Sequence, residues 1–163
     1  MPSKESHCHA ALENNAALQY LLLRIEDYPQ WVVTVAFYKA LHIVEAMFAA
    51  DRKSTKKDTD NHETRNRLLK TERRYQKIWG HYRVLWNDSL VARYLKEGET
   101  FDSKNPPFKF LSYVPADKIL SQHINHHLHQ ILESARIILD DPSFLADCNF
   151  KATAKRSEEH TSE

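Results

Sequence analysis

The chain has 163 residues, of which 42% are hydrophobic and 28% are charged, and its formal net charge is +1. This is the size and composition of one globular domain, and the weak net charge excludes strong sequence-independent attraction to nucleic acid. Only two glycines occur, which excludes the Gly-rich loops of the common nucleotide-binding folds and favours an all-α protein.

Two helices are predicted in the first third of the chain. Leucines recur at helical spacing over residues 6–27, and this helix should end before Pro29 because a residue that precedes proline avoids the helical conformation. The next helix, Pro29–Ala50, is apolar on nearly every side and should lie buried among its neighbours. It is long enough to cross a membrane, but Lys39, His42 and Glu45 would be costly in lipid, so we expect no membrane contact.

The middle of the chain predicts a loop followed by two helices. Residues 51–60 are polar and should form a solvated connection. Asp60 and Glu63 resemble a capping box that starts a short helix over residues 62–70. A longer helix over residues 71–97 carries a broad stripe of aromatic and aliphatic side chains.

A loop and one long helix are predicted in the last third. Prolines and aromatic residues over positions 101–115 indicate an ordered loop, and apolar spacing predicts a helix over residues 116–140. Together these segments predict an up-and-down bundle of four to five helices in a single domain, residues 1–150. Residues 151–163 should form a disordered tail, whose last eight residues resemble the translation of a sequencing adapter found in metagenomic assemblies. Cys8 and Cys148 form no spaced disulfide framework, which favours the reducing cytoplasm.

A row of polar side chains crosses the apolar second helix. Tyr38, His42 and Glu45 are four and three residues apart, so they share one helical face. Polar groups on such a helix need partners or water. They form either a structural network with the helix over residues 71–97 or one wall of a polar binding site.

Basic residues that could bind a phosphate follow in the next helices. His62, Arg65 and Asn66 share one face of the short helix, and arginine beside histidine suits a phosphate group. Arg74 and His81 lie two turns apart, and Arg93 lies further along the chain. Ordinary solvated surface charge is the alternative interpretation of these residues.

The last predicted helix contains four histidines. His123 and His127 have the i, i+4 spacing by which two imidazoles share a metal ion. Further ligands would have to come from His42, Glu45 or His62, since Glu133 is the one nearby carboxylate. Solvated surface histidines are favoured, so no metal or other cofactor is expected. His7, next to Cys8, is expected at a frayed terminus.

Three segments together resemble a known family. WVVTVAFYKALHIVEA, beginning at Trp31, looks like the signature helix of HEPN-like domains. NHETRNR, beginning at Asn61, and YRVLWNDSLVARYL, beginning at Tyr82, are similar to further blocks of a small bacterial subgroup. The resemblance implies a helical bundle, often a homodimer, that binds RNA, a nucleotide or a partner protein. An antitoxin of nucleotidyltransferase type would be such a partner, because many members act in toxin–antitoxin or defence systems.

Many HEPN-like proteins are metal-independent ribonucleases in which four to six residues separate an arginine from the histidine that follows it. Arg74 and His81 match this interval at its upper limit, with Tyr75 where asparagine, aspartate or histidine is usual. Arg65 and Asn66 begin like the signature but have no histidine downstream at the right distance. The resemblance therefore implies Arg74 and His81 as catalytic residues and Tyr38, His42, Glu45, His62, Arg65, Asn66 and Arg93 as binding residues. The alternatives are a metal-binding bundle enzyme similar to the DinB-like group, using His42, His123 and His127, and a non-catalytic structural subunit.

Overall fold

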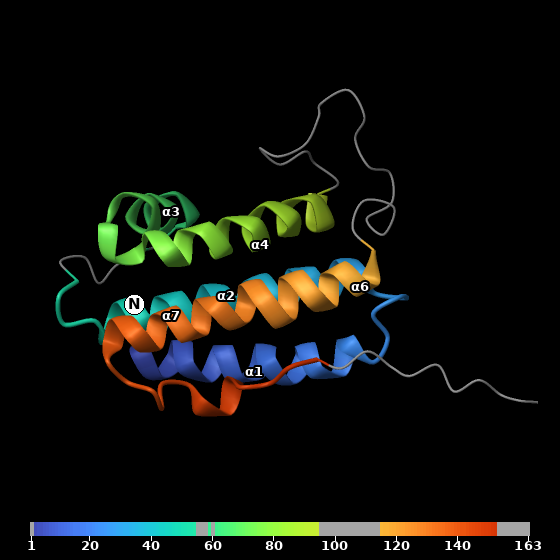
Figure 1. Ribbon diagram of the computed structural model, residues 1–163, viewed down its shortest axis with the longest axis horizontal. Coiled ribbons are helices and arrows are strands. Elements are labelled where there is room, and N and C mark those ends of the chain that lie inside the picture. Colours follow the sequence, from blue (N-terminus) through green and yellow to red (C-terminus); the bar gives the residue numbers. More distant parts are fainter. Residues whose placement is uncertain (1, 55–58, 60, 95–114, 153–163) are drawn as a thin grey trace, which may run out of the picture.

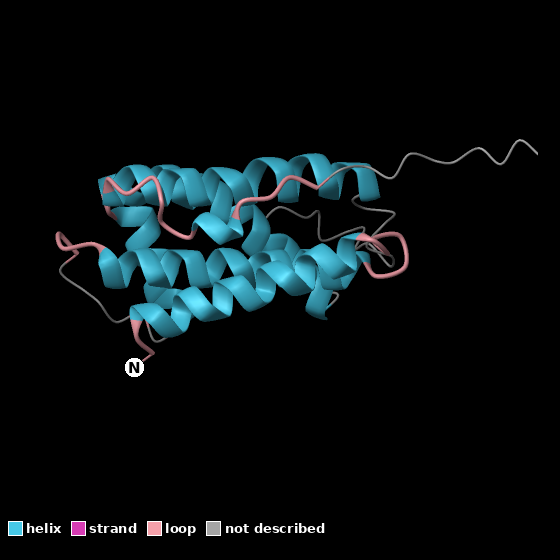
Figure 2. Cartoon of the chain, turned by 90° about the horizontal axis from the view of Figure 1, so that it is seen from below, coloured by secondary structure: helices cyan, strands magenta, loops and turns pink. Residues whose placement is uncertain are grey.

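The computed structural model describes residues 2–54, 59, 61–94 and 115–152, which form an all-α bundle (Figure 1). Its long helices are α1 (Lys4–Leu22), α2 (Pro29–Ala50), α4 (Gln76–Tyr94) and a continuous run of α6 (Ala116–Lys118), η2 (Ile119–Leu128) and α7 (His129–Leu139). No strand occurs in these described ranges (Figure 2). The predicted all-α bundle is therefore confirmed.

Helix α2 is the central element of the bundle. It contacts α1, α4, η2 and α7, and its bounds are those predicted, with Pro29 in the first turn. Within the described residues it is the one helix long and apolar enough to span a membrane, and 78% of that apolar window is buried inside the protein. Such burial is typical of the core helix of a soluble bundle.

Helix α1 differs from the prediction at both ends. It begins at Lys4 because the Ser3 hydroxyl caps it, accepting a hydrogen bond from the Ser6 amide at 3.1 Å. It ends at Leu22, and the residues up to 27 form turns instead of a last helical turn. His7 therefore lies inside a capped helix and not at a frayed terminus.

The helix expected over residues 71–97 is interrupted near its start. Asn61 caps α3 (His62–Thr71) by accepting from the Thr64 amide at 2.8 Å, so Asn61 and not Asp60 is the capping residue. Glu72 is extended, with ψ of 116°, and η1 (Arg73–Tyr75) precedes α4. Tyr75 is held here by the buried carboxylate of Asp51, to which its hydroxyl donates a hydrogen bond at 2.5 Å. The predicted helix end at residues 95–97 and the loop over residues 101–114 lie outside the described residues.

The last helix changes its winding along its length. Residues of η2 form a π-helix, with hydrogen bonds from i to i+5, before α7 returns to α-helical geometry and ends at Asp140 in the left-handed conformation. The following segment packs back on the bundle, where the Ala152 amide donates to the Asn125 side chain at 2.9 Å. Positions 153–163 of the predicted tail lie outside the described residues.

Candidate functional site

The polar stripe of α2 faces α3 and α4. Glu45 forms an ion pair with Arg65 of α3, and the Tyr38 hydroxyl accepts a hydrogen bond from Arg93 of α4 at 3.1 Å. His42 faces α1 instead, where its Nδ1 lies 3.1 Å from Nδ1 of His7. Glu45 and Tyr38 thus contact Arg65 and Arg93, two of the predicted binding residues.

The ion pair of Glu45 and Arg65 is buried, with each residue 6% exposed. Arg65 donates from Nε to Glu45, its Nη1 lies 3.1 Å from Nδ1 of His62, and its Nη2 donates to the Thr59 carbonyl at 3.3 Å. The Thr59 hydroxyl donates to the same Glu45 oxygen. Because every nitrogen of the guanidinium has a partner, this pair is a structural tie between α2 and α3.

Arg93 has a different environment. It is half-buried, and it donates to the Ser89 carbonyl at 3.2 Å and to the Tyr38 hydroxyl at 3.1 Å. Its guanidinium lies over the rings of Phe37 and Tyr94, 5.6 and 5.1 Å from their centroids. Among the described residues it forms no ion pair with a carboxylate, so its charge stays uncompensated there.

The histidines around these arginines are poor bases. Burial lowers the pKa of His7, His42 and His62, and the nearby arginine charges lower the pKa of His62 further. Their imidazoles are therefore neutral at pH 7 and available as hydrogen-bonding groups. The side-chain oxygen of Asn66 is buried and has no partner among the described residues.

The predicted catalytic residues contact different neighbours. Arg74 binds Asp51 through both terminal nitrogens, at 2.9 and 3.1 Å. Nδ1 of His81 lies 3.0 Å from Nδ1 of His127 on η2. The structure therefore gives each residue its own set of partners, and their joint catalytic role stays a prediction.

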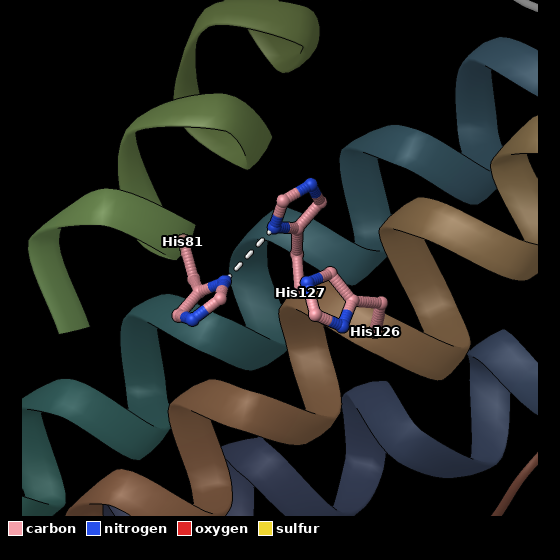
Figure 3. Close-up of side chains that lie close together, drawn as sticks. All are labelled: His81, His126 and His127. Carbon is pink, nitrogen blue, oxygen red and sulfur yellow. Dashed lines mark hydrogen bonds between the residues drawn. The ribbon is translucent and has the colours of Figure 1, made fainter. Parts of the chain in front are cut away.

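Three histidines meet between α4 and η2, and we call His81, His126 and His127 the histidine cluster. One ring nitrogen of each lies within 4.8 Å of the others, and Figure 3 shows all three rings turned toward a common point. His126 is exposed, and the other two are half-buried. Burial lowers the pKa of His127 to about 4, and the neighbouring histidines His81 and His126 add to this shift.

The residues expected to complete a metal site lie elsewhere. His42, Glu45 and His62 belong to the contacts of α2 with α1 and α3 described above. His123 is buried and bonds through Nε2 to the carboxylate of Asp88 on α4. Asp88 was not among the predicted site residues, although it lies seven residues after His81 and hence on the same helical face.

Comparisons with protein-family models, with curated proteins and with solved structures give no match for this chain. The resemblance to HEPN-like domains therefore rests on the sequence segments alone.

Proposed function

We propose that this chain is a HEPN-like module that binds a phosphate group of an RNA strand or a nucleotide at Arg93. The observation that carries the proposal is the contrast between two arginines near α2. Arg65 is neutralised by Glu45, whereas Arg93 has no carboxylate partner among the described residues. A half-buried, uncompensated guanidinium is the group that a phosphate neutralises most effectively.

The neighbours of Arg93 suit such a ligand. The Tyr38 hydroxyl lies beside the guanidinium, and His62 is close enough for the charge of Arg93 to lower its pKa. Tyr94, which is 56% exposed, offers a ring on which a base could stack. Arginine would hold the phosphate, and the hydroxyl and imidazole would complete its hydrogen bonds.

Binding of labelled single-stranded RNA and of ATP, measured by fluorescence anisotropy at several salt concentrations, tests this proposal. Arg93→Gln should weaken binding about tenfold at low salt and reduce the salt slope by about one, as expected for one lost phosphate contact. Arg83→Gln removes the same charge from an exposed position of α4 and is the matched control. Equal losses in both variants, or no binding to either ligand, would overturn the proposal.

The geometry favours binding over ribonuclease activity. Arg74 forms an ion pair with Asp51, and His81 contacts His127 of the histidine cluster, so each side chain is held by its own partners. Incubation of the protein with labelled RNA in the presence of a chelator tests whether it cleaves RNA without a metal ion. Metal-independent cleavage that both Arg74→Ala and His81→Ala abolish would instead support a catalytic Arg–His pair.

We also infer a homodimer in the cytoplasm. Large aromatic side chains are exposed where α1 and α2 join, including Tyr20 at 75% and Trp31 at 62%, beside a surface pocket of about 420 Å³. Exposed apolar patches of this kind mark protein interfaces. Light scattering should show a dimer that Trp31→Ser weakens. If light scattering shows a monomer, the chain does not form a homodimer, and this patch would instead bind a different protein, such as an antitoxin.

A further inference from the structure

We propose that His81, His126 and His127 form a binding site for a transition-metal ion of the Zn²⁺, Ni²⁺ or Co²⁺ type. Three imidazoles would hold the ion, and its fourth position would face solvent. This inference does not depend on phosphate binding at Arg93, which involves other residues.

The distances within the histidine cluster fit one ion. Zn–N bonds of about 2.0–2.1 Å in a tetrahedral site place ligand nitrogens roughly 3.3 Å apart. The nitrogens of His81 and His127 lie 3.0 Å apart, and all three ligand atoms lie within 4.8 Å. Small rotations of the exposed His126 ring would therefore complete the site.

A simple hydrogen bond explains only part of the cluster. Two neutral imidazoles at 3.0 Å can share one proton, which accounts for His81 and His127. It gives no reason for the third ring, which stands 5.2 Å from His81 and 4.9 Å from His127 between centroids. A metal ion satisfies all three nitrogens at once.

The π-helix brings consecutive histidines to the same place. Neighbouring residues of a regular α-helix point about 100° apart, so His126 and His127 would normally diverge. In the wider turn of η2 both rings approach His81 across the gap to α4 (Figure 3). π-Helical geometry is rare in proteins, and its commoner single-turn form is frequent at functional sites.

The surroundings favour a nitrogen-preferring dication. The three ligands are imidazoles with no carboxylate or thiol among them, which suits zinc, nickel, cobalt or copper and disfavours magnesium and calcium. The buried carboxylate of Asp88 supplies a negative charge behind the site: it bonds to His123, whose ring centroid is 6.4 Å from that of His127. Exposure of His126 leaves the open position accessible to water or an anion.

Metal titration of the full chain, purified without a histidine tag and freed of metal with chelator, tests the site. Calorimetry with Zn²⁺ and visible absorption with Co²⁺ should show one ion per chain in a four-coordinate environment. His81→Gln and His126→Gln should each weaken binding by about 100-fold or more, since loss of even an outer partner costs 10- to 100-fold. His126 is exposed, so this variant should keep the fold and the test remains decisive.

Two controls separate this site from other histidines. His129→Gln changes the same helical run outside the cluster, and His9→Gln changes an exposed histidine of α1; both should bind like wild type. Arg93→Gln should also bind metal normally, so failure of the phosphate proposal leaves this one intact. Absence of stoichiometric binding, or equal weakening in the cluster variants and the controls, would overturn the metal site.

Discussion

The ion pair of Glu45 with Arg65 and the histidine cluster both join neighbouring helices, but they satisfy their polar groups in different ways. Each nitrogen of Arg65 has a protein partner, and its charge is balanced by Glu45. In the histidine cluster the ring nitrogens lie within 4.8 Å of one another without a carboxylate among them, and one of the three rings is exposed. A cluster of polar side chains is therefore a candidate binding site only where its hydrogen bonds and charges are not already satisfied within the protein.

Breaking the ion pair should have the largest effect on stability. Glu45→Gln leaves the buried guanidinium of Arg65 without a counter-charge, which should lower the free energy of unfolding by about 3–5 kcal/mol. Urea unfolding followed by circular dichroism measures it. The surface pair of Arg24 with Asp27 is the matched control, and Asp27→Asn should cause no measurable change.

A double variant sharpens the conclusion. Glu45→Leu with Arg65→Met removes both charges from the same place and should recover most of the loss in Glu45→Gln. If the double variant has the same free energy of unfolding as Glu45→Gln, the destabilisation comes from losing the hydrogen bonds with Thr59 and His62. The unpaired charge of Arg65 would then not be its cause.

Lys39 extends the comparison to a buried cation held by neutral groups. Its ammonium donates to the Asn15 side chain at 2.8 Å and the Cys148 carbonyl at 3.1 Å, and burial lowers its pKa from 10.5 to about 8. Between these pH values the unfolded chain binds more protons than the folded one, so stability rises with pH. Between pH 7 and pH 9.5, the free energy of unfolding of the wild type should therefore rise by about 2 kcal/mol relative to that of Lys39→Met.

The same unfolding experiment at a series of pH values measures this gain. Lys39→Met keeps Cys148, whose thiol pKa is raised by burial, so taking the difference between the two proteins reduces the opposite effect of that thiol. Parallel curves for the two proteins would mean that Lys39 stays protonated over the whole range and that burial does not shift its pKa.

Local signals in the sequence predicted most of the fold. Pro29 and continuous apolar composition give the bounds of α2, and these are confirmed. The break around Glu72 escaped prediction because it depends on Arg74 and Tyr75 reaching Asp51, more than twenty residues away in the chain. Such long-range contacts leave no periodic pattern.

The partners of the polar residues were harder to predict than the residues themselves. The stripe of α2 was visible as spacing, but which helix it faces depends on packing. His123 and His127 had metal-ligand spacing in a regular helix, whereas η2 is a π-helix and brings His126 and His127 to His81. Ten residues of apolar pattern do not distinguish the two windings.

The smallest effect that we predict concerns Asp88 and its bond to His123. Asp88→Asn keeps the shape but removes the negative charge behind the histidine cluster, so Co²⁺ affinity should fall about tenfold. Glu133→Gln, which alters a carboxylate paired with Arg136, should leave that affinity unchanged. If both variants bind cobalt like wild type, Asp88 only fixes His123 in the core. A loss confined to Asp88→Asn, with an altered cobalt spectrum, would show that the contact between Asp88 and His123 supports metal binding at the histidine cluster beside it.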